Sequence, residues 1–334
     1  MTAVITSTAA GLFCEPGGFH VDPWMSADLA VITHVHGDHL HAGSRRYVCA
    51  APSEAFLRKR LGADVDVTAV PYGERVPLGQ ATVSFHPAGH VLGSAQVRIE
   101  AGGEVWVISG DYKRAPDPTC APFEVVPCDV FVTEATFGLP IYRWEEPTQV
   151  VAEILQWWDS NRAAGEASLL FCYAMGKAQR ILAELARLTD RPALVHGAVE
   201  SLTALYREAG VSMLPTQPVA ETGRRRSYAG ELILAPPSAG GTPWVRRFGA
   251  RETGFASGWM RVRGARRRRG FDRGFALSDH ADWPALLRTI EETGARRVLV
   301  THGYSEELAR FLRERGLAAD ALATAFEGEA GAES

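Results

Sequence analysis

The sequence predicts an α/β fold in two parts, and three observations lead to this prediction. The first ~140 residues contain short β-branched apolar runs separated by turns. From Thr148 the pattern changes to helices that alternate with strands, and strand and helix patterns return after residue 272. The length of 334 residues suits two domains better than one.

The first part is expected to be rich in strands that end abruptly in polar residues. A helix is expected at 52–61, with Ser53 as its cap. The expected strands are LAVITH (29–34), QATVSFHPAGH (80–90), EVWVISGD (104–111) and CDVFVTEAT (128–136). Polar residues at strand ends are therefore the first candidates for a functional site.

The middle of the chain is expected to form a parallel sheet with crossover helices. An amphipathic helix from Thr148 is closed by Gly165, and the buried strand ASLLFCYA follows it. The same rhythm continues through GKAQRILAELARL, PALVHG and SLTALYREAG. Such alternation is typical of βαβ units. A Gly-, Pro- and Arg-rich region (215–270) follows, and the last expected elements are ADWPALLRTIEETG, RRVLVTHG and SEELARFLRERG.

Composition excludes several classes of protein. Hydrophobic residues make up 46% and charged residues 22%, which excludes wholesale disorder. No apolar stretch approaches the ~20 residues of a membrane span, and the N-terminus lacks the pattern of a secretory signal. Five scattered cysteines without a CxxC spacing argue against a disulfide framework or a cysteine zinc site. We therefore expect a cytoplasmic protein without a membrane partner.

Charge is unevenly distributed along the chain. The 28 residues from Arg246 to Arg273 hold ten arginines and two acidic residues, a local net charge of +8, whereas the whole chain carries −4. A basic stretch on an acidic body suits a phosphodiester backbone. A genome that prefers arginine to lysine is an equally good explanation, because only three basic residues are lysines.

The segment THVHGDH, directly after the strand LAVIT, predicts a metal site. Alternate side chains of an extended chain point the same way, so that His34 and His36 can bind one ion together. Asp38 and His39 come from the following turn and can face a second ion. Histidine and carboxylate ligands without cysteine favour zinc, with manganese as the alternative.

Two later segments contain residues that would complete a site for two divalent cations. His90 lies in PAGHVLGSA, where glycines allow a tight turn, and Asp111 ends EVWVISGD, where its carboxylate can bridge two cations. Each alone is a weak indication, since a single histidine or aspartate is more often structural. Their order after THVHGDH strengthens both.

HVHGDH, PAGH and SGD, in this order, resemble the metallo-β-lactamase superfamily. The resemblance implies an αββα sandwich with two metals at one sheet edge. It assigns His34, His36 and His90 to one metal, Asp38 and His39 to the other, and Asp111 to both. Asp22, in HVDPW, matches the additional aspartate of the superfamily, and we interpret it as a residue that orients a ligand histidine.

Three downstream motifs resemble those of the β-CASP nucleases within that superfamily. They are Glu134 in TEATFG, His280 in LSDHAD and His302 in VTHG. A structural role before a helix (His280) or at a strand end (His302) is the alternative. The resemblance implies an inserted α/β cap domain at 145–272, between parts of the metallo-β-lactamase domain at 1–144 and 273–334. It also implies that His302 completes the second metal site.

Longer segments are similar to bacterial ligase-associated DNA damage response exonucleases. These segments are DPW, PAGHVLGSAQVR, SGDYKRAPDPTCAPFE, TFGLPIYRW and YAMGKAQR. The similarity implies a DNA exonuclease acting on single strands or duplex ends in DNA repair, associated in function with an ATP-dependent DNA ligase and an Lhr-type helicase. A histidine at the position of His302 is instead typical of the RNA-processing branch of the β-CASP nucleases, so that a ribonuclease of RNase J type is the alternative. A small-molecule metallo-hydrolase and a non-catalytic scaffold are weaker alternatives.

The predicted mechanism divides the work among four catalytic residues. Asp38 is a ligand of the second metal, and Asp111 and the metals hold the attacking hydroxide. His280 donates a proton to the leaving oxygen, and Glu134 orients His280. Five further residues lie in motif segments and are expected to bind substrate: Lys113, Lys177, Gln179, Arg180 and Ser257.

Overall fold

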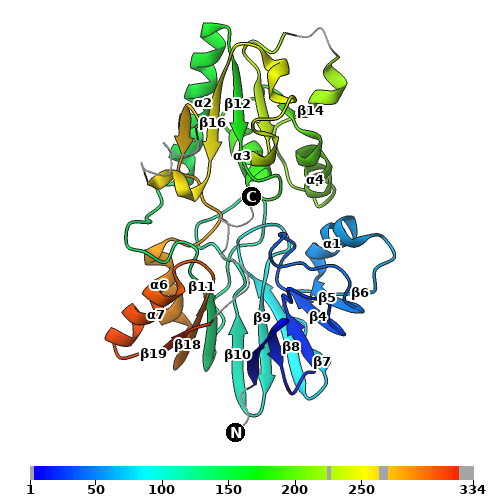
Figure 1. Cartoon of the computed structure of the whole chain (residues 1–334), viewed down its shortest axis with the longest axis vertical. Coiled ribbons are helices and arrows are strands. Elements are labelled where there is room, and N and C mark those ends of the chain that lie inside the picture. The colour runs from blue at the N-terminus through cyan, green and yellow to red at the C-terminus, as the bar shows by residue number, and fades with distance from the viewer. Residues whose placement is uncertain (1–3, 224–226, 263–269, 323–334) are drawn as a thin grey trace. The chain divides into compact units, whose positions relative to one another are not determined.

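The computed structural model describes residues 4–223, 227–262 and 270–322, and the chain divides into two compact units (Figure 1). Within the described residues, the first unit comprises 4–143 and 280–322, and the second unit lies between Trp144 and Asp279. The second unit is therefore an insertion in the chain of the first. It ends later than the expected residue 272, because β17 (Arg273–Phe275) pairs with β16 (Arg251–Ala256) and extends its sheet.

The first unit contains two sheets within the described residues. The first sheet follows chain order, β1-β2-β3-β4-β5-β6. Its strands are β1 (Ile5–Thr8), β2 (Gly11–Cys14), β3 (Phe19–Val21), β4 (Leu29–Ile32), β5 (Arg46–Ala50) and β6 (Val67–Val70). The second sheet has the order β19-β18-β11-β10-β9-β8-β7. Its strands are β7 (Val76–Leu78), β8 (Ala81–Pro87), β9 (Ala95–Ala101), β10 (Glu104–Ile108), β11 (Val130–Glu134), β18 (Arg297–Thr301) and β19 (Ala318–Ala321).

Strand periodicity explains how the second sheet is covered on both faces. Trp106 and Val132 point into a core shared with the first sheet, whereas Val107 and Phe131 point to the opposite face. That face packs against α6 (Trp283–Thr293) and α7 (Ser305–Glu314). α1 (Glu54–Leu61) connects the parallel strands β5 and β6 as a crossover helix of the first sheet. This arrangement confirms the predicted α/β sandwich.

The expected helix at 52–61 is present, but Ser53 does not cap it as predicted. A short 3₁₀ turn, η1 (Ala51–Ser53), precedes α1, and the Ser53 side chain makes no capping hydrogen bond. Its hydroxyl instead donates to the carbonyl of Gly93 at 2.8 Å. Ser53 therefore joins the start of α1 to the loop that carries His90.

The second unit is built on one parallel sheet, as the alternating pattern predicted. The strand order is β14-β13-β15-β12-β16-β17, and all paired strands are parallel. The strands not yet given are β12 (Ala167–Phe171), β13 (Ala193–Val195), β14 (Thr216–Pro218) and β15 (Leu232–Ala235). The α-helices are α2 (Pro147–Ala164), α3 (Lys177–Leu185) and α4 (Gly197–Glu208). The short 3₁₀ helices are η2 (Val219–Thr222), η3 (Pro237–Ala239), η4 (Val245–Phe248) and η5 (Gly258–Arg261).

The two faces of this sheet pack against different kinds of structure. Leu170 of β12 contacts a core formed with α2 and α3, whereas Leu169 and Phe171 contact a core formed with η3, η4 and η5. Among the helices of the described residues, none is long and apolar enough to cross a membrane.

Candidate metal centre

Several of the predicted site residues of the first unit lie at or just after the carboxyl ends of strands. β4 is buried along its whole length and leads directly into THVHGDH. In the second sheet, β10 is parallel to β11, and β11 is parallel to β18. The carboxyl ends of these strands therefore lie at one edge of the sheet, where Asp111, Glu134 and His302 are placed.

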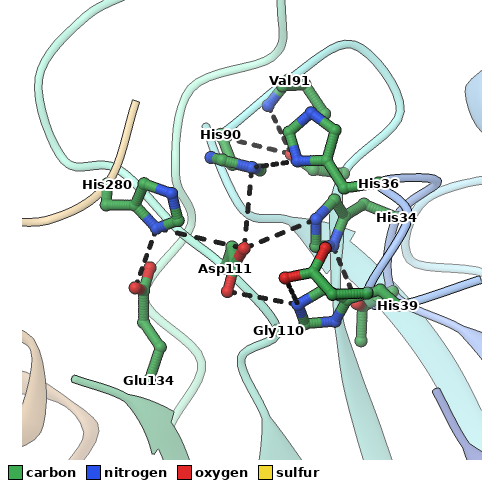
Figure 2. A network of polar contacts seen from close by, with 12 residues as sticks. His34, His36, His39, His90, Val91, Gly110, Asp111, Glu134 and His280 are labelled. Carbon is green, nitrogen blue, oxygen red and sulfur yellow. Dashed lines mark hydrogen bonds and ion pairs between the residues drawn. The ribbon is translucent and has the colours of Figure 1, made fainter. Parts of the chain in front are cut away.

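Asp111 lies at the centre of a histidine cluster (Figure 2). Its Oδ2 atom is 3.5 Å from Nε2 of His34 and 3.8 Å from Nε2 of His90. Nδ1 of His36 lies 3.0 Å from Nε2 of His90. The other carboxylate oxygen of Asp111, Oδ1, is 3.4 Å from Nε2 of His39. One oxygen of this carboxylate thus faces His34 and His90, and the other faces His39.

The donor atoms of both groups fit divalent cations. Single atoms of His34, His36, His90 and Asp111 lie within 4.8 Å of one another, and Asp38, His39 and Asp111 form a second such group. Nε2 of His34 and Nε2 of His39 are buried and have no hydrogen-bond partner among the described residues, an arrangement that disfavours folding unless another group binds them. Nitrogen and oxygen donors without thiolate suit zinc or manganese. Both groups therefore fit cations that share Asp111.

Burial and the carboxylates have opposite effects on the histidines of the cluster. Burial lowers the pKa of His34 well below its ordinary value, and His39 lowers it further. Burial also disfavours charge on His39, but Asp111 and Asp38 outweigh burial and raise the pKa of His39 well above its ordinary value. The site therefore favours positive charge beside the carboxylates, and it keeps His34 neutral, which is the form that binds a metal.

Asp22 contacts His39, and its predicted role of orienting a ligand histidine stays a prediction. Its Oδ1 accepts the backbone N–H of Thr33 at 2.7 Å, and its Oδ2 accepts the Thr33 hydroxyl. Oδ2 also lies 2.7 Å from Nδ1 of His39. Asp22 has a φ of 43°, a left-handed conformation that aspartate tolerates better than most residues. The backbone therefore turns at Asp22 so that one carboxylate reaches both the strand end and the ring of His39.

His280 and Glu134 form a buried pair beside the cluster (Figure 2). Nδ1 of His280 lies 2.9 Å from Oε2 of Glu134, and Oε1 accepts the backbone N–H of Tyr112 at 2.7 Å. Burial raises the pKa of Glu134, and His280 opposes that increase. The ring centroid of His280 is 4.7 Å from that of His90. The pair therefore holds one imidazole with a fixed orientation next to the candidate ligands.

His302 lies on the other side of the site, beside His39. The two rings stack with their centroids 5.1 Å apart. His302 directly follows β18 with a φ of 56°, and its Nδ1 lies 3.0 Å from the hydroxyl of Thr301. It is not part of the groups of candidate ligands found among the described residues. Its assignment to the second metal therefore stays a prediction.

The residues predicted to bind substrate have buried side chains with internal contacts. Lys113 forms an ion pair with Asp117. In the second unit, Nζ of Lys177 is 3.5 Å from Asp279, and Nη1 of Arg180 is 3.0 Å from the same carboxylate. Gln179 accepts the backbone N–H of Gly176, and the hydroxyl of Ser257 accepts the N–H of Trp259. Lys177 and Arg180 thus share the carboxylate of Asp279, and the binding role of all five residues stays a prediction.

Two residues that the sequence interpretation missed contact the metal-site loop. The hydroxyl of Thr33 lies 3.1 Å from Nδ1 of His34, so that this residue links Asp22 to a candidate ligand. Its place at the strand end, directly before His34, was an available signal. Arg60 of α1 donates to the carbonyl of Val35. Nothing in the sequence around Arg60 indicates this contact, because it depends on how α1 packs.

Comparisons with known proteins identify relatives along most of the chain. No protein-family model matches the chain. It is 32% identical over 314 residues to a probable DNA ligase of Opitutus terrae, an alignment that covers 93% of this chain and 30% of the relative. It is 26% identical over 163 residues to the endoribonuclease YSH1 of Eremothecium gossypii, which covers 48% of this chain and 20% of the relative. The chain thus spans less than a third of the length of these curated relatives.

A solved structure supports the fold alone. The crystal structure of a protein of unknown function from Enterococcus faecalis aligns with a TM-score of 0.58 at 10% sequence identity. The alignment covers 90% of this chain and 80% of that protein. The similarity in fold therefore extends over most of the chain.

Proposed function

Because this chain is related to the β-CASP nucleases of the metallo-β-lactamase superfamily, we propose that it is a metal-dependent hydrolase of phosphodiester bonds in nucleic acid. The observation that carries the proposal is the position of Asp111, whose two oxygens face two different groups of potential ligands. Such sharing is typical of sites with two cations, which nucleases use to neutralise phosphate.

Each group of ligands would hold one divalent cation. His34, His36 and His90 would hold the first, Asp38 and His39 with His302 would hold the second, and Asp111 would contact both. When bound, such cations offset the charge of the phosphodiester and lower the pKa of a bound water molecule. Zinc is the proposed cation, with manganese as the alternative.

His280 is the proposed proton donor to the leaving oxygen. Its Nδ1 is bound to Glu134, so that the proton available to substrate is the one on Nε2. Glu134 is itself fixed by the N–H of Tyr112, which leaves the carboxylate as an acceptor for His280. Asp22 keeps the proton of His39 on Nδ1 and so leaves Nε2 for the second cation.

The proposed substrate is DNA, and the proposed activity is exonucleolytic cleavage in DNA repair. An alignment over 93% of this chain with a protein named as a probable DNA ligase supports a connection to DNA ends. On the same ground we propose that the chain acts together with an ATP-dependent DNA ligase. The sequence resemblance further supports a functional association with an Lhr-type helicase, and we propose a cytoplasmic location. The relative named as an endoribonuclease favours the second candidate, an RNA-processing enzyme of RNase J type.

The test uses metal-free protein reloaded with zinc or manganese. Single-stranded DNA and RNA of identical sequence, labelled separately at each end, are supplied to the native protein and to Asp38→Ala. Asp28→Ala is the matched control, because the Asp28 side chain is 89% exposed and forms a surface ion pair with Arg45 at 3.6 Å. We expect stepwise release of mononucleotides from DNA, lost in Asp38→Ala and retained in Asp28→Ala. Preference for RNA would favour the second candidate, and cleavage of neither strand would refute the nuclease proposal.

A second variant tests the role of His280. We expect His280→Ala to bind two metal equivalents while its turnover falls by ~10²–10⁴-fold, the usual contribution of a positioned acid. The measurement pairs metal content with the rate of DNA hydrolysis. A rate near the native value at full metal content would exclude His280 as the proton donor.

A further inference from the structure

The second unit contains a cavity that the proposed hydrolytic site does not use. Its volume is about 550 Å³, which lies within the range of small-molecule sites. The end of β12, the segment around η3 and η4, the start of β16 and the chain just before β17 line it. The side chains that matter below are Phe171, Thr242, Arg246, Arg251 and Phe271.

The charge of the cavity wall is positive. Arg246 and Arg251 line it, and its described lining contains no acidic residue. Nη1 of Arg251 donates to the carbonyl of Gly249 at 2.9 Å, whereas its Nε is buried and has no hydrogen-bond partner within the described part of the chain. A buried guanidinium N–H without an acceptor is costly, and phosphate oxygens are acceptors that arginine binds well. The nearby carboxylate of Asp272 accepts both the N–H and the hydroxyl of Thr253.

One wall of the cavity is aromatic. Phe271 stacks on Phe255 with the ring centroids 5.0 Å apart and an interplanar angle of 22°. Phe271 also lies 5.0 Å from Phe171 in a tilted arrangement. Phe171 and Phe255 are buried, whereas Phe271 is only half-buried and lines the cavity. An aromatic ring held in this way is a suitable platform for a nucleobase.

We propose that this cavity binds one nucleotide, free or as part of a strand. Arg246 and Arg251 would bind the phosphate, and the base would lie against Phe271. The inference goes beyond the proposed hydrolysis, because it depends only on residues of the second unit and concerns binding. The binding of a nucleotide that is part of a nucleic-acid strand rests on the proposed function, whereas the binding of a free nucleotide does not.

The test measures the binding of 5′-dAMP to the full-length, metal-loaded chain by isothermal titration calorimetry. Adjacent arginines provide a matched pair of variants. Arg246 lines the cavity, whereas Arg247 lies outside its lining and stacks over Trp244 at 5.7 Å. Both are exposed, and the two substitutions Arg246→Glu and Arg247→Glu change the net charge equally. Any general electrostatic effect should therefore be the same in both.

We expect Arg246→Glu and Arg251→Gln to raise the Kd of dAMP by about tenfold or more, and Arg247→Glu to raise it by less than about twofold. We also expect Phe271→Ala to weaken dAMP more than inorganic phosphate, because only dAMP has a base to stack. Equal losses in Arg246→Glu and Arg247→Glu, or no binding of dAMP at millimolar concentration, would overturn the proposal.

A phosphorothioate single-stranded DNA, which resists hydrolysis, distinguishes the two sources of the nucleotide. Parallel loss of dAMP and strand binding in Arg246→Glu assigns the cavity to the strand, whereas loss of dAMP binding alone assigns it to a free nucleotide. Hydrolysis is measured separately with the DNA substrate described above. A protein that binds dAMP in this cavity but does not cleave DNA would refute the proposed function and leave the cavity assignment intact.

Discussion

Replacing Asp22 by asparagine should weaken one of the two metal sites and leave the other unchanged. Oδ2 of Asp22 accepts the Thr33 hydroxyl and lies 2.7 Å from Nδ1 of His39, which requires the proton of His39 on Nδ1. An amide nitrogen in that position donates instead of accepting. The proton of His39 would then move to Nε2, the nitrogen that faces Asp38 and Asp111. Asparagine tolerates the φ of 43°, so that the backbone itself should not be strained.

The expected loss of metal affinity in Asp22→Asn follows from the contacts that the asparagine can still make. The amide carbonyl can still accept the N–H of Thr33, so that the backbone directly before His34 keeps its contact with residue 22. One contact that orients one ligand is removed, and such contacts typically change metal affinity by about 10–100-fold. We therefore expect one site with native affinity and one site weakened by that factor, or by about 1.4–2.7 kcal/mol.

The assay is equilibrium dialysis against zinc at graded concentrations, with metal content measured by mass spectrometry. Asp28→Asn serves as the control, since its side chain is 89% exposed. DNA hydrolysis should recover when zinc is raised to fill the weakened site. Two sites of native affinity in Asp22→Asn, or equal weakening of both, would refute the reasoning that Asp22 acts through the tautomer of His39.

Three further predictions concern the backbone, the loop support and the thiols. Gly303→Ala should lower both the midpoint of thermal unfolding and the rate of DNA hydrolysis more than Gly294→Ala does. Both glycines have φ near +60°, but of the two only Gly303 has backbone atoms that an added Cβ would meet, the nearest at 2.4 Å. Arg60→Ala should weaken metal binding by about tenfold, whereas Lys59→Ala should not, because only Arg60 holds the backbone between the two first histidines. Burial raises the pKa of Cys49 to about 12, so this thiol should resist a disulfide reagent at pH 8 in the native protein and react after denaturation. Because the pKa of Cys49 is higher in the folded state, the unfolded chain loses the Cys49 proton at a lower pH than the folded protein does. The free energy of unfolding should therefore fall as pH rises from ~9 toward 12, as measured by denaturant unfolding at a series of pH values.

Much of the candidate metal centre could be predicted from local sequence, because its ligands are closely spaced. His34 and His36 lie two residues apart after a buried strand, and Asp38 and His39 follow in the next turn. Short-range geometry of an extended chain is enough to place such side chains near one another. The α/β character of both units was predictable for a similar reason, since strand and helix periodicities differ and are visible in the sequence.

The partners of buried charges could not be predicted, because they depend on packing between distant elements. Lys177 is predicted to bind substrate, and in the structure its ammonium group is buried 3.5 Å from Asp279, a partner that the sequence did not indicate. A sequence shows that a lysine lies in a motif, but it does not show which carboxylate will neutralise it after folding. Arg60 was interpreted neither as a ligand nor as a support, and its contact with Val35 exists only because α1 packs near the end of β4.

The sequence by itself determined the types of ligand, their order along the chain and the family resemblance, which its relatives confirm. Those properties depend on chemical identity and short spacing. Only the tertiary structure decided that Asp111 presents one oxygen to His34 and the other to His39, and that Glu134 holds His280 beside them. These contacts join residues up to 146 positions apart, and the parallel strands β10 and β11 bring Asp111 and Glu134 to one sheet edge. The aromatic and basic cavity of the second unit has the same origin, since its walls come from separate strands and loops.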